Sequence, residues 1–361
     1  MIVETTAMVG ILSRGPLVAL ISIILFLITL RFLHRDTSSW TRSAISSSVL
    51  SPQTFSTSSS SSPISKLYND RYGRPTATAP YITKQIWQIF FSPPASTPPA
   101  DTFQDIPTWL PMAPDWTYTL IGDAGGSSFV EAHFGEDRRD IVEAYHALGN
   151  SSDGRNNSHK NLALKSDFLR YLLLFVRGGV YSDLDTRPLA PLDEWVPAER
   201  RDSVRLVVAV EYDSPVLGPT EMYPIQFSQW TIASAAGHPV MACMIERALA
   251  GLRGLGVVGG SRNNGDSGGA VRPGENAVYN ATGPIGWTEC VMEGIRAAVE
   301  SPESFRHANL SGIAEPRYYG DIMVLPDGTF AASLPPGSPK PANGDRVGLV
   351  SHAFRGVWKH S

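Results

Sequence analysis

The most constraining feature of this sequence is the stretch from Lys165 to Leu189, which reads KSDFLRYLLLFVRGGVYSDLDTRPL. Its apolar residues predict a helix over residues 162–176 that is packed on most of its circumference. The Gly178-Gly179 pair predicts a left-handed end to that helix, and Val180-Tyr181 predict the start of a strand. A buried helix that passes directly into a strand favours an α/β fold.

Two pairs of charged residues lie within this stretch. Asp167 and Arg170 are three positions apart, so they share one face of the predicted helix. Asp183 and Asp185 follow the strand, where alternate residues project to the same side unless the chain bends. Two neighbouring carboxylates repel each other unless a cation lies between them, and oxygen ligands favour Mn²⁺ or Mg²⁺.

An Asp-x-Asp triplet alone is also typical of an exposed turn with two solvated acids. Here it accompanies a same-face acid and base, a double glycine and a strand within about twenty residues. In open α/β sheets, ligands bind beyond the carboxyl ends of the strands, which is where the two aspartates fall. The combination therefore predicts a metal–diphosphate site.

The remainder of the chain alternates strands with helices, which predicts an α/β fold with a mostly parallel central sheet. The expected strands cover residues 81–91, 115–123, 205–213, 322–326 and 347–354. The expected helices cover residues 127–135, 138–149, 162–176 and 287–300. Helical spacing also extends over residues 226–252, with an interruption at Gly237 and Pro239.

The N-terminal region predicts a membrane anchor. The segment from Gly15 to Leu30 is uncharged and would span about 24 Å as a helix. We therefore predict a cytosolic tail over residues 1–14 and a transmembrane anchor over residues 15–33; the alternative is a cleaved signal peptide. Arginines after the span oppose this orientation under the positive-inside rule, whereas four downstream glycosylation sequons favour a luminal body. The sequons begin at Asn150, Asn156, Asn280 and Asn309.

Composition divides the rest of the chain. Residues 34–80 are rich in Ser and Thr and predict a disordered stem, whereas residues 81–361 form the predicted folded domain, with a Gly-rich insertion at about 254–276. A formal net charge of −4 gives no electrostatic reason to expect nucleic acid binding. The two cysteines, Cys243 and Cys290, allow either one disulfide bridge or two buried thiols.

The motifs K-S-D-F-L-R-Y and R-G-G-V-Y-S-D-L-D-T resemble the core of glycosyltransferase family 32, whose members include the fungal initiation-specific α-1,6-mannosyltransferases of the Golgi. Four further motifs are similar to those of the family and come in the same order. They are QIWQ (85–88), QFSQWTIASAAGHP (226–239), TGPIGWT (282–288) and SHAFRGVWK (351–359). The resemblance covers most of the chain from Tyr81 to Lys359.

This resemblance implies a GT-A nucleotide-sugar-binding fold and retaining sugar transfer. The implied donor is GDP-mannose, the implied metal is Mn²⁺ or Mg²⁺, and the implied acceptor is a mannose-containing glycan, with α-1,6 transfer on N-glycans. The implied location is the Golgi membrane, with a single-pass type II anchor and a luminal catalytic domain. Retention would use either a carboxylate nucleophile or front-face attack guided by the leaving phosphate.

The resemblance also implies roles for individual residues. Asp185 would bind the metal directly, while Asp183 would contact the ribose and the water shell of the metal. Asp167 and Arg170 would hold the donor sugar and the diphosphate. These four are the implied catalytic residues, and the implied metal set is Asp183, Asp185 and His352.

The remaining implied residues bind the donor. His352 and Trp358 would close over the diphosphate, and Gly283-Pro284 would lie near the reacting sugar. Trp87 would either stack on the guanine base or pack in the core. The family usually has a serine where this sequence has Val357, so a metal contact of that hydroxyl would be lost or taken over by water.

Three alternatives stay open at this level. A transferase of the same fold could use a UDP-sugar donor or a sphingolipid acceptor, and a protein with a degenerate site could bind carbohydrate without catalysis. The intact acids and Arg170 count against a degenerate site. Asp321 is either an acceptor-side carboxylate or a structural acid that precedes a strand.

Overall fold

The computed structural model describes residues 82–91, 98, 100–149, 158–217, 223–255, 280–331 and 348–355. All of them belong to the compact unit Ser58–Ser361. The predicted tail, anchor and stem lie outside these residues, as does most of the Gly-rich insertion. No helix in the described part of the chain is long and apolar enough to cross a membrane.

The described strands and helices alternate along much of the chain. The strands are β1 (Gln85–Ile89), β2 (Thr117–Ile121), β3 (Gly179–Ser182), β4 (Thr186–Pro188), β5 (Leu206–Asp213), β6 (Ile225–Phe227), β7 (Thr231–Ser234), β8 (Arg317–Tyr319), β9 (Ile322–Leu325) and β10 (Val350–His352). The α-helices are α3 (Trp109–Met112), α4 (Asp123–Phe134), α5 (Arg139–Gly149), α6 (Ser158–Arg177), α7 (Pro239–Gly254) and α9 (Pro284–Ala298). Short 3₁₀ turns are η1 (Ile106–Thr108), η2 (Leu192–Glu194), η3 (Ala198–Arg200) and η4 (His307–Leu310).

The central sheet has the strand order β2-β1-β3-β7-β5-β9-β8, with β6 paired to β5. The pairs β1–β2, β1–β3 and β5–β9 are parallel, whereas β3–β7, β5–β7, β5–β6 and β8–β9 are antiparallel. The α/β class is confirmed, but the expectation of a mostly parallel sheet is wrong because the sheet is mixed. The antiparallel pairs at its centre come from β7, which runs against both of its neighbours.

The helical spacing expected over residues 226–252 is also wrong in its first half. Residues 225–227 and 231–234 form β6 and β7, and the helix α7 begins only at Pro239. Every residue of these two strands is buried, so neither face of either strand is exposed to water. A short strand that is buried on both faces carries no alternation, and its pattern is therefore easily mistaken for that of a buried helix.

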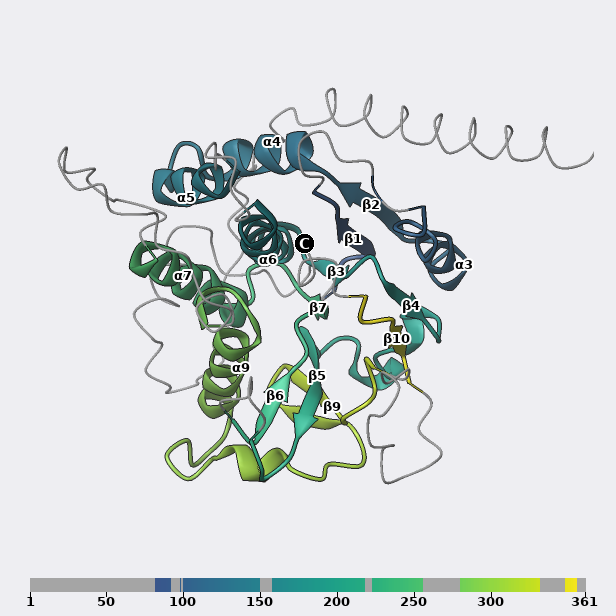
Figure 1. Ribbon diagram of the computed structural model, residues 1–361. Coiled ribbons are helices and arrows are strands. Elements are labelled where there is room, and N and C mark those ends of the chain that lie inside the picture. Colours follow the sequence, from purple (N-terminus) through teal and green to yellow (C-terminus); the bar gives the residue numbers. More distant parts are fainter. Residues whose placement is uncertain are drawn as a thin grey trace, which may run out of the picture. The chain divides into compact units, whose positions relative to one another are not determined.

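Two apolar clusters flank the sheet. Alternate residues of β5 divide between them, with Leu206 and Val208 in the larger cluster and Val207 and Ala209 in the smaller one. The larger cluster includes buried residues of α4, α5, α6, α7 and α9, which lie on one side of the strands (Figure 1). The period-two division shows that β5 is buried between two layers.

The turn from α6 into β3 depends on two glycines with positive φ. Gly178 has φ +67° and donates its N–H to the Leu174 carbonyl at 2.8 Å, which confirms the predicted left-handed helix end. Gly179 has φ +100°, and a Cβ there would lie 2.3 Å from the Gln85 carbonyl oxygen. No larger residue fits without moving β1, so the glycine pair fixes where β3 begins.

Two links join segments that are distant in the sequence. The strand β10 pairs antiparallel with β4 and places His352 opposite Thr186. A disulfide bridge joins Cys243 of α7 to Cys290 of α9, so the bridge is formed rather than two free thiols. The first link brings residues 350–355 beside the Asp183–Asp185 turn.

Candidate active site

Asp183 and Asp185 lie in a tight turn between β3 and β4, at the carboxyl end of β3. Three hydrogen bonds fix the backbone of Asp183: its N–H donates to the Trp230 carbonyl, and its carbonyl accepts from Gln88 Nε2 and Thr186 Oγ1. The chain therefore bends where a continuous strand was the simplest expectation. The bend belongs to a fixed turn, in which three different segments hold Asp183.

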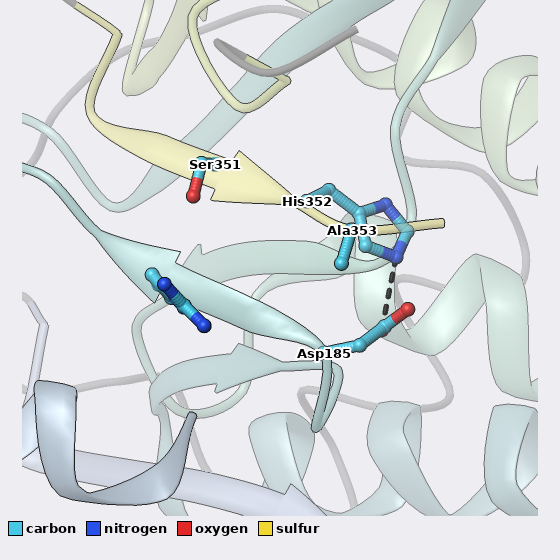
Figure 2. A pocket seen from close by; sticks show the side chains of 5 residues that line it. Asp185, Ser351, His352 and Ala353 are labelled. Carbon is cyan, nitrogen blue, oxygen red and sulfur yellow. Dashed lines mark hydrogen bonds and ion pairs between the residues drawn. The ribbon is translucent and has the colours of Figure 1, made fainter. Parts of the chain in front are cut away.

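Asp183, Asp185 and His352 form the candidate metal centre. Each offers one ligand atom, and the three atoms lie within 4.8 Å of one another. Figure 2 shows the His352 ring directed at the Asp185 carboxylate, with 3.0 Å between His352 Nε2 and Asp185 Oδ1. The Asp183 and Asp185 side chains are 31% and 18% exposed, so both acids are reachable by a small ion.

A cavity of about 250 Å³ borders this centre. Its lining is formed by Asp185, Arg187, Ser351, His352 and Ala353, all from the β4 and β10 segments (Figure 2). The His352 ring also packs against Trp230 and Phe354, with centroid distances of 4.8 and 4.0 Å. The imidazole is thus held in place by packing while its edge faces the acid.

The carboxylate of Asp185 is held by its neighbours in the charged form. Burial acts to raise its pKa, but the hydrogen bond and charge of His352 and the Arg355 N–H at 2.8 Å outweigh burial and lower the pKa below the ordinary value. The Asp185 carbonyl accepts a further bond from the Ala353 N–H at 2.9 Å. An ionised carboxylate is the form of Asp185 that could bind a metal.

Asp183 is held from the side of α6. Its Oδ1 accepts a hydrogen bond from the Tyr181 hydroxyl at 2.6 Å and lies 3.4 Å from Arg170 Nη2. The Arg170 guanidinium stacks over the Tyr181 ring at 4.5 Å and donates to the Gln229 carbonyl at 3.0 Å. Its Nε is buried and has no partner among the described residues. Arg170 therefore supplies a fixed positive charge beside Asp183.

Asp167 lies deeper and joins α6 to the start of α9. It forms an ion pair with Arg170 at 2.8 Å and accepts a hydrogen bond from Thr282 Oγ1 at 2.9 Å. Burial raises the pKa of Asp167 to about 6, against the opposing effects of Arg170 and Thr282. Thr282 directly precedes Gly283 and Pro284, which begin α9 and are buried, so these two residues lie beside the acid.

The structure thus brings together Asp167, Arg170, Asp183, Asp185, His352 and Gly283-Pro284, although their assigned roles stay predictions. Trp87 lies apart from this group. Its side chain belongs to the helix-side core, 6% exposed, and its indole N–H donates to the Gly178 carbonyl at 2.9 Å. That is the packing alternative stated above. Trp358 and Val357 lie outside the described residues.

Asp321 lies at the opposite edge of the sheet. It directly precedes β9, which is parallel to β5, and both β3 and β5 run antiparallel to β7. The amino end of β9 is therefore level with the amino end of β3, whereas the metal centre follows the carboxyl end. Asp321 lies 3.5 Å from His238 Nε2 and 3.9 Å from Arg205 Nε. Both contacts are typical of a structural acid that precedes a strand.

Several residues near the site were not predicted. Tyr181, Thr282 and Arg355 lie inside sequence motifs that predicted roles for other residues. Those motifs did not predict the contacts of these three. Asp105 carried no local signal. It stands in an irregular segment, and yet it pairs with both Arg187 and Arg355 beside the metal centre.

The donor set fits a divalent cation. Two carboxylates and one imidazole are ligands that suit Mn²⁺ and related first-row ions. His352 Nδ1 is buried and has no partner among the described residues, whereas Nε2 is the ring atom that faces Asp185. The carboxylates of Asp183 and Asp185 lie in one cluster, and a bound cation would offset their mutual repulsion.

Known proteins are similar to this chain in sequence. Residues 99–202 match the family described as "Glycosyltransferase sugar-binding region containing DXD motif". The initiation-specific alpha-1,6-mannosyltransferase of Schizosaccharomyces pombe is 30% identical over 254 residues, which cover 70% of this chain and 58% of that protein. The enzyme of the same description from Candida albicans is 30% identical over 275 residues, which cover 70% of this chain and 65% of that protein.

The chain thus spans about three fifths of the length of these relatives. Among solved structures, the PaToxG glycosyltransferase is similar over 64% of this chain and 74% of its own length, with 14% identity and a TM-score of 0.37. The resemblance to glycosyltransferase family 32 is confirmed by the family match and the two relatives together.

Proposed function

We propose that this chain, which contains a glycosyltransferase sugar-binding region with a DXD motif, is a retaining mannosyltransferase. It moves mannose from GDP-mannose to a mannose-containing glycan, with α-1,6 transfer on N-glycans as the proposed linkage. The observation that carries the proposal is the cluster of Asp183, Asp185 and His352 at the carboxyl edge of β3, beside a cavity. The choice of mannose rests on the printed names of the relatives.

The proposed fold is of the GT-A type and the proposed metal is Mn²⁺, with Mg²⁺ as the second choice. The ion would be held by Asp183, Asp185 and His352, and when bound it would neutralise the diphosphate that leaves the sugar. The mixed sheet does not conflict with this fold, because the two acids still follow a strand that lies parallel to β1. The site thus keeps the position that ligands take in open α/β sheets.

The protein side chains supply the rest of the chemistry. Arg170 is already held by Asp167, by Asp183 and over the Tyr181 ring, so its charge is in place before a diphosphate arrives. Positive charge fixed where negative charge develops lowers the barrier without reorganisation at the moment of reaction. Arg170 therefore acts as an electrostatic stabiliser and not as a base.

Asp167 has a different role in this proposal. Its carboxylate can accept hydrogen bonds from sugar hydroxyls, while the Thr282 hydroxyl and Arg170 fix its orientation. Because Gly283 and Pro284 follow Thr282 directly, the start of α9 lies where the donor sugar would be held. Orientation of the sugar between α6 and α9 reduces the entropy lost at the reacting centre.

We further propose a Golgi membrane location, with a type II anchor at residues 15–33 and a luminal catalytic domain. The Cys243–Cys290 bridge supports it, because disulfides persist in oxidising compartments such as the secretory pathway. Asn280 and Asn309, which begin two of the sequons, are both exposed. Digestion with an endoglycosidase would increase the gel mobility of protein isolated from cells, and unchanged mobility would contradict luminal exposure.

The activity is tested with the purified full-length chain, a panel of GDP- and UDP-sugars, and mannose-terminated glycans. We expect transfer from GDP-mannose that stops when metal is removed with a chelator and resumes with added Mn²⁺. Product linkage is read by nuclear magnetic resonance, with an α-configured product expected. Turnover that persists without metal, or a preference for a UDP-sugar, would overturn the mechanism or the donor assignment respectively.

A further inference from the structure

The side chain of Asp105 is fully buried, although it lies in an irregular segment just before η1. Its two oxygens have different partners: Oδ1 pairs with Arg187 Nε, and Oδ2 pairs with Arg355 Nη2 at 2.6 Å. A buried carboxylate is stable only when it is paired, and here two guanidinium groups pair with it. The three residues are more than 80 positions apart in sequence, so only the folded chain assembles them.

The two arginines belong to the two strands that frame the metal centre. Arg187 lies in β4, two residues after Asp185, and Arg355 follows β10, three residues after His352. Three backbone pairings hold β10 to β4. Asp105 thus adds a side-chain link between the same two segments, at the end where β10 has finished.

The segment that follows β10 determines how Asp185 is held. The Ala353 N–H donates to the Asp185 carbonyl at 2.9 Å, and the Arg355 N–H donates to Asp185 Oδ2 at 2.8 Å. His352 Nε2 forms a hydrogen bond with the other carboxylate oxygen, Oδ1. Arg355 therefore contacts Asp185 through its backbone and Asp105 through its side chain, and a shift of this residue changes both contacts.

Asp101 gives a comparison within the same cluster. It lies 3.9 Å from Arg355 Nε, but its side chain is 57% exposed, whereas that of Asp105 is fully buried. An exposed pair at this distance is screened by water and contributes little. The anchoring of Arg355 therefore rests on Asp105.

We propose that Asp105 is a positioning residue of the metal centre. Its ion pair with Arg355 holds residues 353–355 in place, so that the Arg355 amide and His352 keep the Asp185 carboxylate in one orientation. The proposal rests on the proposed function only in taking Asp185 as a metal ligand. Removal of a residue that orients a metal ligand without binding the metal itself typically lowers metal affinity by roughly 10- to 100-fold.

The test compares Asp105→Asn with Asp101→Asn in the full-length chain. Binding of Mn²⁺ is measured from the electron paramagnetic resonance signal of the free ion, without donor or acceptor present. We expect roughly 10- to 100-fold weaker binding for Asp105→Asn, and a change below about twofold for Asp101→Asn. Equal affinities for wild type and Asp105→Asn would overturn the proposal.

A second measurement is independent of metal. Hydrogen exchange of the Ala353 and Arg355 amides reports directly on their bonds to Asp185, and we expect faster exchange in Asp105→Asn but not in Asp101→Asn. If the wild-type chain binds no Mn²⁺, the proposed function fails and this exchange still decides the positioning role. Exchange that is unchanged at both amides would overturn it.

Arg355→Met covers the case in which Asp105→Asn does not fold. This variant keeps the amide that bonds Asp185, removes the guanidinium, and leaves Asp105 paired with Arg187. We expect the same faster exchange and weaker Mn²⁺ binding as for Asp105→Asn, with near-ultraviolet circular dichroism showing that the fold is retained. Wild-type exchange and affinity in Arg355→Met would contradict the proposal.

Discussion

The molecule contains an aspartate–histidine pair at each of two opposite edges of one sheet. At the carboxyl edge of β3, Asp185 lies 3.0 Å from His352, and at the amino edge of β9, Asp321 lies 3.5 Å from His238. Both carboxyl groups have a lowered pKa, although burial acts to raise it, because the histidine and the other neighbouring groups together outweigh burial. The residue types and the direction of the carboxyl pKa shift are therefore the same at both edges.

The surroundings of the two pairs differ. Asp185 has a second acid, Asp183, within the same 4.8 Å cluster and borders a cavity. Asp321 is instead accompanied by Arg205, and its carbonyl accepts bonds from the Arg205 and Leu206 N–H groups at the start of β5. The comparison teaches that a second acid and an adjoining cavity distinguish a candidate metal site from a structural aspartate–histidine pair.

The largest difference is expected for catalysis. Under the proposed function, Asp185→Asn should lower kcat/KM for the donor by roughly 10³-fold, because it removes a carboxylate charge that would hold the metal. Asp321→Asn should stay within about twofold, as expected for a surface change far from the reacting groups. Initial rates at saturating Mn²⁺ measure both, and a loss below tenfold for Asp185→Asn would remove the distinction between the edges.

The second difference concerns the arginine at each edge. Arg170→Met leaves Asp167 buried without its ion-pair partner and should lower the free energy of unfolding by about 3–5 kcal/mol. Arg205→Met, at the other edge, removes a more exposed arginine with a longer ion pair and should cost about 1 kcal/mol. Urea unfolding followed by tryptophan fluorescence compares them, and similar losses would contradict the contrast.

Removal of the disulfide should affect the stability of the fold more than the binding of metal. It joins α7, which begins at Pro239 after His238 on the amino edge, to α9, which begins at Pro284 after Gly283 on the carboxyl edge. Replacing both cysteines by alanine should lower the free energy of unfolding by about 2–4 kcal/mol. The Mn²⁺ affinity should change less than about twofold, because the bridge joins α7 to α9, whereas the candidate ligands follow β3 and lie in β10. A tenfold loss would show that the bridge shapes the site.

The pH dependence of stability should have opposite signs for Asp167 and Asp321. The folded pKa of Asp167, about 6, lies above its unfolded value of 3.8, so its contribution is fully present below pH 3.8 and is lost as the pH rises through 6. Relative to Asp167→Asn, metal-free wild type should lose on the order of 3 kcal/mol between pH 4 and 7. For Asp321, whose pKa is lowered, the contribution is present above pH 3.8 and is lost on acidification. Urea titrations at several pH values test both signs.

The smallest effect is expected for Asp321→Asn at neutral pH. Its side chain is 41% exposed, so water screens its pairs with His238 and Arg205. The free energy of unfolding should fall by less than about 1.5 kcal/mol. A loss above 3 kcal/mol would show that the amino edge depends on its acid as strongly as the carboxyl edge depends on Arg170.

Local patterns predicted the segment that holds the site. The periodicity of α6, the double glycine and the strand after it each depend on neighbouring residues, and all three are present in the structure. The bend at Asp183 was left open, because it depends on Trp230 and Gln88, which come from other strands. Short-range chemistry thus located the acids but not the shape of their turn.

Long-range pairing accounts for the failures. The strands β6 and β7 are buried on both faces, so their pattern gave no alternation and was interpreted as helical. That error hid the antiparallel centre of the sheet. Asp105 was not predicted for a related reason: its two arginines lie 82 and 250 positions away, and nothing beside it in sequence marks it.

The pairing of β4 with β10 has a consequence during protein synthesis. Asp185 and His352 are 167 positions apart, so at about 5–20 residues per second a ribosome needs roughly 10–30 s to supply the histidine after the acid. In that interval the nascent chain carries the two aspartates without the imidazole or the Arg355 amide. The emerging polypeptide therefore cannot assemble the complete candidate ligand set until residues 350–355 have been translated.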